Sequence, residues 1–180
     1  METRESFQLD VVSVRLVRDA PLFSDRKICR PEDAVAVVGE VLGEMDREVL
    51  CVLNLKEDGT PINCNFASIG AINKAIAEPR ELFKSAILSN AANMILVHNH
   101  PSGNVMPSKE DTMLTDRILK LTDLLGIPLL DHVIVGGNNR CYFSFHEKKM
   151  MERPKISVIQ NYEQLEFKNQ ALAAEPKRGR

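Results

Sequence analysis

Between residues 93 and 135 the chain places a short apolar run, an amphipathic segment and a second apolar run one after another. The first run, NMILVHNH, has the length of a buried strand and ends in polar residues. Ser108 then opens a segment with apolar residues at helical spacing, and Gly126 ends it. The second run, IPLLDHVIV, predicts another strand. A strand, a helix and a strand in this order constrain the chain to an α/β fold.

The part of the chain before this unit predicts a helix and a hairpin. Pro31, followed by two acidic residues, is typical of a helix start, and apolar residues continue at helical spacing to about Met45. Residues 48–55, EVLCVLNL, and residues 60–70, TPINCNFASIG, predict two strands. The Asp58-Gly59 pair between them predicts the connecting turn.

Further elements are predicted from weaker patterns. Alternation in residues 7–17 predicts an N-terminal strand, and a short strand is expected near residues 69–76. A second helix is expected to begin at Pro79 and to end near Asn90. Residues 140–145, RCYFSF, predict a last strand after a GGNN turn. We therefore expect a mixed β-sheet flanked by helices, which is an α/β sandwich.

Charge, hydropathy and cysteine content argue against several classes of protein, namely nucleic-acid-binding, membrane-spanning and secreted proteins. The net charge of -2 counts against nucleic acid as a partner, without excluding it, because phosphate binding requires clustered Lys and Arg. No apolar run approaches the ~20 residues of a membrane span, and the opening METRESFQLD lacks the apolar region of a signal peptide. The four cysteines form no C-x-x-C pair, which is typical of free thiols in a reducing compartment. We expect a cytoplasmic protein that does not bind membranes.

His98 and His100 most directly indicate chemistry. They stand two residues apart at the end of a predicted strand, so their side chains point to the same side, while Asn99 points to the other. After the loop, Asp111 falls in the first turn of the next helix and can return a carboxylate to the strand end. Two histidines and one carboxylate are a recognised set of catalytic zinc ligands, which leaves a fourth position for water.

A hydrolytic zinc site also needs a base for the proton of water and a donor for the oxyanion. Glu48, at the start of a buried strand, is the candidate base, and Ser108 is the candidate donor. Each has a simpler alternative: Glu48 can be a solvated residue beside Arg47, and Ser108 can form a capping box with Asp111. The histidine pair can likewise be two strand-end residues that bind nothing. His132, in mid-strand, is expected to pack in the core or to support a ligand rather than to bind a metal itself.

His98, His100, Ser108 and Asp111, preceded by a glutamate at the start of an apolar strand, resemble the JAMM (MPN+) metalloprotease motif. Four segments are similar to the RadC-like branch of that family, namely HNHPSG, PSKED, LLDH and EPRELFKSAI. The resemblance implies a cytidine-deaminase-like JAB/MPN sandwich.

The resemblance also implies a division of the chain and an activity. Residues 27–149 would form the metalloprotease domain, with a strand and linker in residues 1–26 and a tail in residues 150–180. One zinc ion per chain would be held by His98, His100 and Asp111, and Glu48 would polarise the water that cleaves a peptide or isopeptide bond in a protein or peptide substrate.

Two other functions stay open. Full-length RadC proteins carry a helix-hairpin-helix segment, a DNA-binding element, upstream of this domain, and residues 1–26 do not resemble it. This difference counts against a DNA role. One alternative is nevertheless a metal-dependent nuclease or a DNA-repair-associated RadC-like protein, and the other is a metal-binding module without catalysis.

Overall fold

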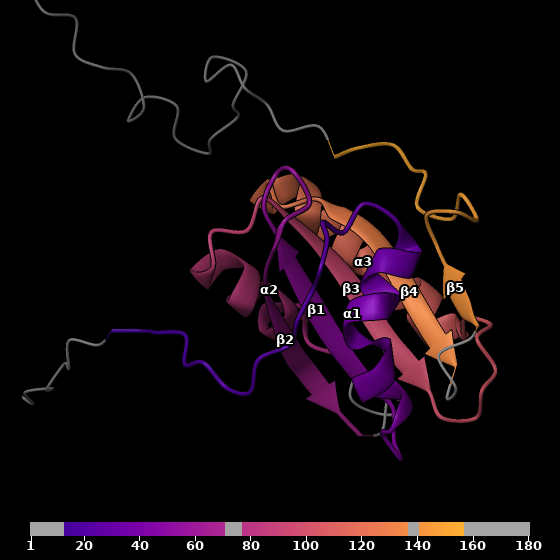
Figure 1. Ribbon diagram of the computed structural model, residues 1–180. Coiled ribbons are helices and arrows are strands. Elements are labelled where there is room, and N and C mark those ends of the chain that lie inside the picture. The colour runs from indigo at the N-terminus through magenta and orange to yellow at the C-terminus, as the bar shows by residue number, and fades with distance from the viewer. Residues whose placement is uncertain (1–12, 71–76, 137–140, 157–180) are drawn as a thin grey trace, which may run out of the picture.

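The computed structural model describes residues 13–70, 77–136 and 141–156, and it shows one sheet with helices on both faces (Figure 1). The strands lie in the order β2-β1-β3-β4-β5. In chain order the elements are α1 (Pro31–Gly43), β1 (Val49–Leu55), β2 (Pro61–Ile69), α2 (Pro79–Leu88), β3 (Asn93–His100), α3 (Lys109–Leu125), β4 (Leu129–Gly136) and β5 (Tyr142–Ser144). The predicted α/β sandwich is confirmed.

The sheet is mixed, as the sequence predicts. Strand β1 is antiparallel to both of its neighbours, β2 and β3, and β5 is antiparallel to β4. Strands β3 and β4 are parallel, which requires a crossover between them, and α3 is that crossover. The carboxyl end of β3 and the start of α3 are therefore neighbours in space as well as in sequence.

Alternate residues of the central strands face different helices. On one face, Val49, Cys51 and Leu53 of β1 pack with Val38 and Leu42 of α1. On the other face, the intervening residues of β1 and β3 pack against α2 and α3, and this cluster comprises Leu50, Val52, Leu82, Phe83, Met94, Leu96, Ile118 and Leu129. Every residue of β1 is buried, and all but Asn54 are apolar, so the strand does not alternate between apolar and polar residues.

The helices begin where their sequence signals predict. Ser108 is the N-cap of α3, and its Oγ accepts a hydrogen bond from the Asp111 amide at 3.1 Å. Gly126 ends α3 with a φ of 67°, in the left-handed region where glycine carries no steric penalty. Helices α1 and α2 begin at their prolines and end slightly earlier than predicted.

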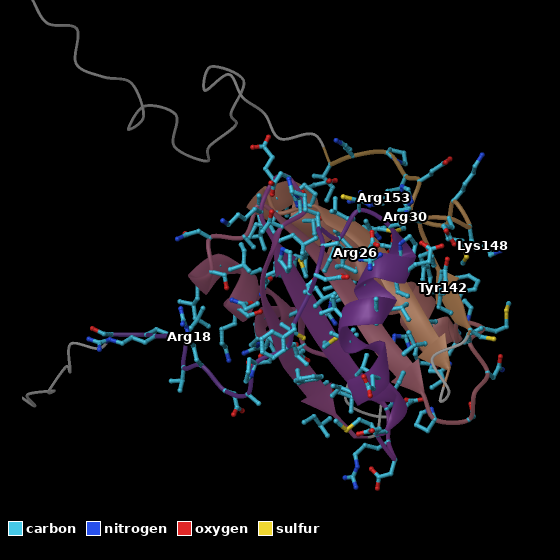
Figure 2. The ribbon with its side chains drawn as sticks, in the orientation of Figure 1. Arg18, Arg26, Arg30, Tyr142, Lys148 and Arg153 are labelled. Atoms are coloured by element: carbon cyan, nitrogen blue, oxygen red, sulfur yellow. The ribbon has the colours of Figure 1, made fainter. Side chains whose placement is uncertain are left out.

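The N-terminal segment differs from the prediction. Residues 13–17, the described part of the predicted strand 7–17, belong to no strand in the described part of the chain. Their apolar side chains stay exposed, with Val14 69% and Val17 91% accessible, and Arg18 points away from the domain (Figure 2). Alternation alone predicted this strand, but a strand needs a partner edge and a surface to bury against. Three predicted parts lie outside the described residues: residues 7–12, residues 71–76 of the strand expected near 69–76, and residues 137–139 of the GGNN turn.

The described start of the tail contacts the domain rather than leaving it. The Arg153 guanidinium pairs with the Asp123 carboxylate at 2.8 Å, and the Ile156 amide donates to the same carboxylate at 2.8 Å. In the described ranges, no helix combines the length and the apolar character needed to cross a membrane.

Candidate metal centre

The two histidines at the end of β3 face the same side of the sheet as α3. They lie on β3, the central strand of the sheet, and His98 pairs with Leu50 of β1 on one side and with Ile134 of β4 on the other. Both side chains are buried, His98 at 1% and His100 at 9% exposure. Burial of two polar rings in this position requires that each ring nitrogen has a partner.

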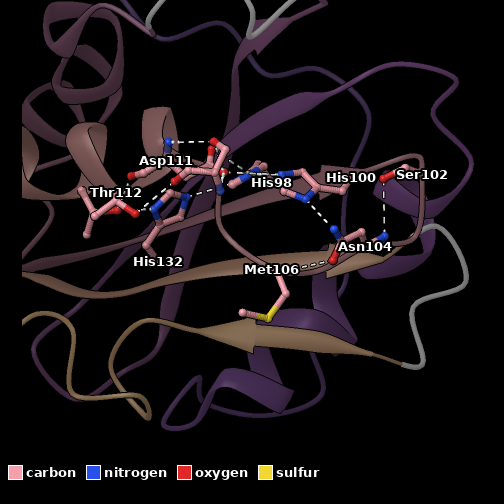
Figure 3. A network of polar contacts seen from close by, with 10 residues as sticks. His98, His100, Ser102, Asn104, Met106, Asp111, Thr112 and His132 are labelled. Carbon is pink, nitrogen blue, oxygen red and sulfur yellow. Dashed lines mark hydrogen bonds and ion pairs between the residues drawn. The ribbon is translucent and has the colours of Figure 1, made fainter.

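Asp111 completes a compact cluster with them (Figure 3). The Nε2 atoms of His98 and His100 are 2.9 Å apart. Asp111 Oδ1 lies 3.3 Å from His98 Nε2, and Asp111 Oδ2 lies 3.5 Å from His100 Nε2. One ligand atom from each residue fits within 4.8 Å of the others, so the three residues can hold a metal ion.

Asp111 also forms the capping box of α3, so ligation and capping are not exclusive alternatives. Its Oδ2 accepts hydrogen bonds from the Ser108 amide at 2.7 Å and from the Ser108 hydroxyl at 2.6 Å. Its Oδ1 lies near His98, and the capped Oδ2 also lies near His100. The capping bonds therefore hold the carboxylate in an orientation that keeps both of its oxygens close to the histidines.

A hydrogen-bond chain that ends on a carbonyl sets the tautomer of His98. The Thr115 hydroxyl donates to the Asp111 carbonyl at 2.7 Å, so its oxygen must accept from His132 Nδ1, also at 2.7 Å. His132 Nε2 then accepts from His98 Nδ1 at 2.8 Å. Tautomers inferred in this way leave the lone pair of His98 Nε2 directed at the cluster.

A separate contact fixes the tautomer of His100 and also leaves its Nε2 with a lone pair. Its Nδ1 lies 2.6 Å from the Asn104 carbonyl, which can only accept, so Nδ1 carries the proton and Nε2 has a lone pair. Two imidazole lone pairs and a carboxylate therefore meet in a buried space. Acceptors at these distances repel one another unless a cation, either a proton or a metal ion, lies among them.

The pKa values of His98, His100 and Asp111 show how the three groups affect one another in this buried space. Burial and the neighbouring His132 lower the pKa of His98, whereas the Asp111 carboxylate raises the pKa of His100. Burial raises the pKa of Asp111, but the two histidines and Ser108 outweigh it and hold the pKa below its usual range. Burial also lowers the pKa of His132 to about 4, so this ring is neutral and can accept from His98 as the chain requires.

Glu48 lies beside this cluster, one residue before β1. The β1–β3 pairing ends at Leu50–His98, so Glu48 lies two residues beyond the last pair, just before the strand that lies next to the histidines. Its negative charge contributes to the raised pKa of His100, and its side chain is half-buried rather than fully solvated. Glu48, the candidate base, thus lies close enough to His100 for its charge to act on that ring.

Comparison with known proteins assigns the family. A family model described as "RadC-like JAB domain" matches residues 28–150. The chain belongs to the RadC-like JAB domain family. It is 46% identical over 108 residues to a UPF0758 protein of Desulforamulus reducens, an alignment that covers 60% of this chain and 48% of that protein. A UPF0758 protein of Methanosarcina acetivorans is 43% identical over 111 residues, covering 62% of this chain and 48% of the relative. The chain spans about half the length of these curated relatives.

Two residues of this RadC-like JAB domain support the cluster without having been singled out in the sequence. Thr115 is buried and closes the chain that sets His98, and its place four residues after Asp111 on α3 is the signal that would have found it. The Asn104 carbonyl orients His100 from the loop, where sequence offers no comparable signal.

His132 supports a ligand rather than joining the cluster of three. It contacts His98 through Nε2, stacks on Phe145 with ring centroids 5.0 Å apart, and is fully buried. The neighbouring Asp131 carboxylate accepts from the His132 amide at 2.7 Å and from the Ser144 hydroxyl at 2.6 Å. These contacts lock β4 and β5 around the ring that orients His98.

Proposed function

We propose that this RadC-like JAB domain is a zinc-dependent hydrolase that cleaves a peptide or isopeptide amide. The observation that carries the proposal is the acceptor-only cluster of His98, His100 and Asp111 with a carboxylate, Glu48, at its edge. The names of these relatives state no activity, so the proposal rests on the site.

The donor set fits zinc better than a hard cation. Two imidazole nitrogens and one carboxylate oxygen are typical zinc ligands in catalytic sites, whereas calcium and magnesium take oxygen ligands. Both histidines have the second ring nitrogen occupied by a hydrogen-bond partner, which is typical of metal-binding histidines. Zinc held there would supply a Lewis acid for the scissile carbonyl and lower the pKa of water toward ~7.

The chain's own residues would perform the proton transfers. Glu48 takes a proton from the attacking water and passes it to the leaving amine, as a general base and then a general acid. The Ser108 hydroxyl now donates to Asp111 Oδ2. To stabilise the carbonyl oxygen it must redirect that hydrogen bond to the substrate, which leaves Asp111 Oδ2 the Ser108 amide as its donor.

Metal analysis of the purified chain is the first test. We expect about one zinc per chain in the wild type and loss of zinc in Asp111→Ala. Asp116→Ala is the matched control, because Asp116 lies on the same helix, is exposed and pairs with Lys120. A wild type without zinc after zinc supplementation, or an Asp111→Ala variant that keeps its zinc, would overturn the metal assignment.

Hydrolysis is tested on the zinc-loaded chain with internally quenched peptides and with isopeptides linked through a lysine side chain. Cleavage in the wild type that Glu48→Gln lowers by about 10² or more, at unchanged zinc content, supports a catalytic Glu48. Equal signals from the two proteins would contradict hydrolysis at this site and leave a metal-binding module as the better description. The same Glu48→Gln variant then serves to trap bound substrates from a cell extract.

A further inference from the structure

Asn99, between the two histidines, reaches the opposite face of the sheet from them. Its side chain is completely buried, at 0% exposure. The β3–β1 ladder ends one residue earlier, at the His98–Leu50 pair. Beyond that pair, hydrogen bonds from the Asn99 side chain, rather than from the β3 backbone, connect β3 to the chain leading into β1.

The side-chain amide of Asn99 makes two hydrogen bonds, one with a backbone N–H group and one with a backbone carbonyl. Its Oδ1 accepts from the Val49 amide at 2.7 Å, and its Nδ2 donates to the Arg47 carbonyl at 3.0 Å. These two backbone groups stand immediately before and after Glu48. A third bond, from the Gly70 amide to the Glu48 carbonyl at 2.9 Å, holds the same residue from the end of β2.

We infer that Asn99 is a positioning residue that clamps the backbone around Glu48 and so aims its carboxylate at the metal centre. The inference rests on the proposed function, in which Glu48 is the base. It deepens that function because it assigns a task to the residue between the two ligands, which binds no metal itself. His98, Asn99 and His100 then serve one site from both faces of the sheet.

The chemistry of the clamp requires an amide side chain. One group must accept from Val49 and the other must donate to Arg47, and a carboxamide offers both at a fixed separation. An aspartate would accept from Val49 but present a second acceptor to the Arg47 carbonyl. A leucine of similar shape would leave the buried Val49 amide and the partly buried Arg47 carbonyl without these partners.

Position matters because a general base acts only within hydrogen-bond reach of its proton. Catalytic groups need to be held within about 0.5 Å, and an error of about 1 Å can cost about 10² in rate. Glu48 lies outside β1, so the regular ladder does not hold it. The Asn99 side chain and the Gly70 amide supply the constraint that the ladder lacks.

The test uses the full chain with zinc and compares Asn99→Leu and Asn99→Asp with the wild type. Asn54→Leu is the matched control, because Asn54 is equally buried, lies on β1 and bonds to Asn63 and Ser85 away from Glu48. Amide hydrogen exchange at Val49, measured by NMR, is the readout that needs no substrate. We expect exchange at Val49 to accelerate about tenfold in Asn99→Leu and to change little in the control.

Activity on the best amide probe supplies the second readout. We expect kcat to fall about 10² in Asn99→Leu with KM and zinc content little changed. In the double variant with Glu48→Gln the loss should not exceed that of Glu48→Gln alone, since Asn99 acts through Glu48. Asn99→Asp keeps the acceptor for Val49, so its Val49 exchange should stay slow while kcat falls.

Several results would overturn the clamp. If amide exchange at Val49 in Asn99→Leu stays as slow as in the wild type, the clamp is refuted, whether or not the wild type cleaves any probe. Zinc lost in step with kcat would show that Asn99 supports the histidines instead, and an additive double variant would show that it does not act through Glu48. By contrast, a wild type that cleaves no probe, together with fast Val49 exchange in Asn99→Leu, refutes the proposed hydrolysis and leaves the backbone clamp established.

Discussion

At the scale of single residues, the centre depends on where protons lie rather than on which residues are present. His98 offers its Nε2 lone pair only because His132 and Thr115 fix the proton on Nδ1. The sequence could predict the ligands, since His-x-His on a strand and a carboxylate in the next helical turn follow from local geometry. The sequence also predicted that His132 would pack in the core or support a ligand, but not that it would contact His98, because only the pairing of β3 with β4 brings the two rings together.

Thr115→Val tests this hydrogen-bond chain. Valine has the shape of threonine but gives His132 Nδ1–H no acceptor, so His132 loses the constraint that makes it accept from His98. We expect zinc affinity to fall about 10- to 100-fold, as is usual when a partner of a metal-binding histidine is removed. A competition titration against a chromogenic chelator measures the affinity. Thr122→Val is the control, because Thr122 is buried on α3 and its hydroxyl donates to the Leu119 carbonyl, away from the histidines.

The dependence of zinc affinity on pH follows from the pKa directions. Asp111 raises the pKa of His100, so a proton occupies His100 as the pH falls and must leave when zinc binds. The pKa values of His98 and Asp111 are lowered, so these two ligands stay deprotonated near neutral pH. Affinity should therefore fall about tenfold per pH unit below the pKa of His100, with one proton released per zinc. Calorimetry in buffers of different ionisation enthalpy counts the protons, and a count of zero or two near pH ~6 would contradict the assignment.

At the scale of elements, the strength of a local pattern decided what the sequence could predict. Strand β3 was predicted with its actual bounds, because its apolar run is well marked. Helix α3 was predicted with both of its caps, because Ser108, Gly126 and the helical spacing between them indicate the same element. The N-terminal strand was predicted from alternation alone, and residues 13–17 show no strand pairing in the described structure. The clamp by Asn99 was beyond prediction, because it depends on the register at which the β1–β3 ladder ends.

Ser108→Ala tests how far α3 depends on its N-cap. The variant removes the Oγ acceptor of the Asp111 amide and the hydroxyl donor to Asp111 Oδ2. We expect the free energy of unfolding to fall by about 1 kcal/mol, the usual cost of losing an N-cap side chain. Urea denaturation of the zinc-free chain measures this change without the contribution of the metal. Ser102→Ala, in the exposed loop before α3, serves as control and should change stability by less than about 0.5 kcal/mol.

At the scale of the whole molecule, the candidate centre joins elements that are distant in the sequence. Strand β3 carries two of the three candidate ligands, and α3 carries the third. His132 of β4 contacts His98, and Glu48 lies just before β1. A buried cluster that presents only acceptors weakens the native state unless a cation fills it, because like partial charges repel strongly where water is excluded. Metal binding and global stability should therefore be coupled.

Chelation tests that coupling. Under the proposed function, zinc would bind the native chain and not the dispersed residues of the unfolded chain. It would then stabilise the native state by RT ln(1 + [Zn]/Kd), about 2.7 kcal/mol at a hundredfold excess over Kd. We expect the Tm to rise with zinc and to fall when a chelator is added, measured by thermal unfolding with circular dichroism. Asp111→Ala should unfold at the same temperature under both conditions, whereas Asp116→Ala should respond as the wild type does. If the chelator shifted Asp111→Ala as much as the wild type, the stabilising ion would lie at another site, and the three residues on β3 and α3 would have to be explained without it.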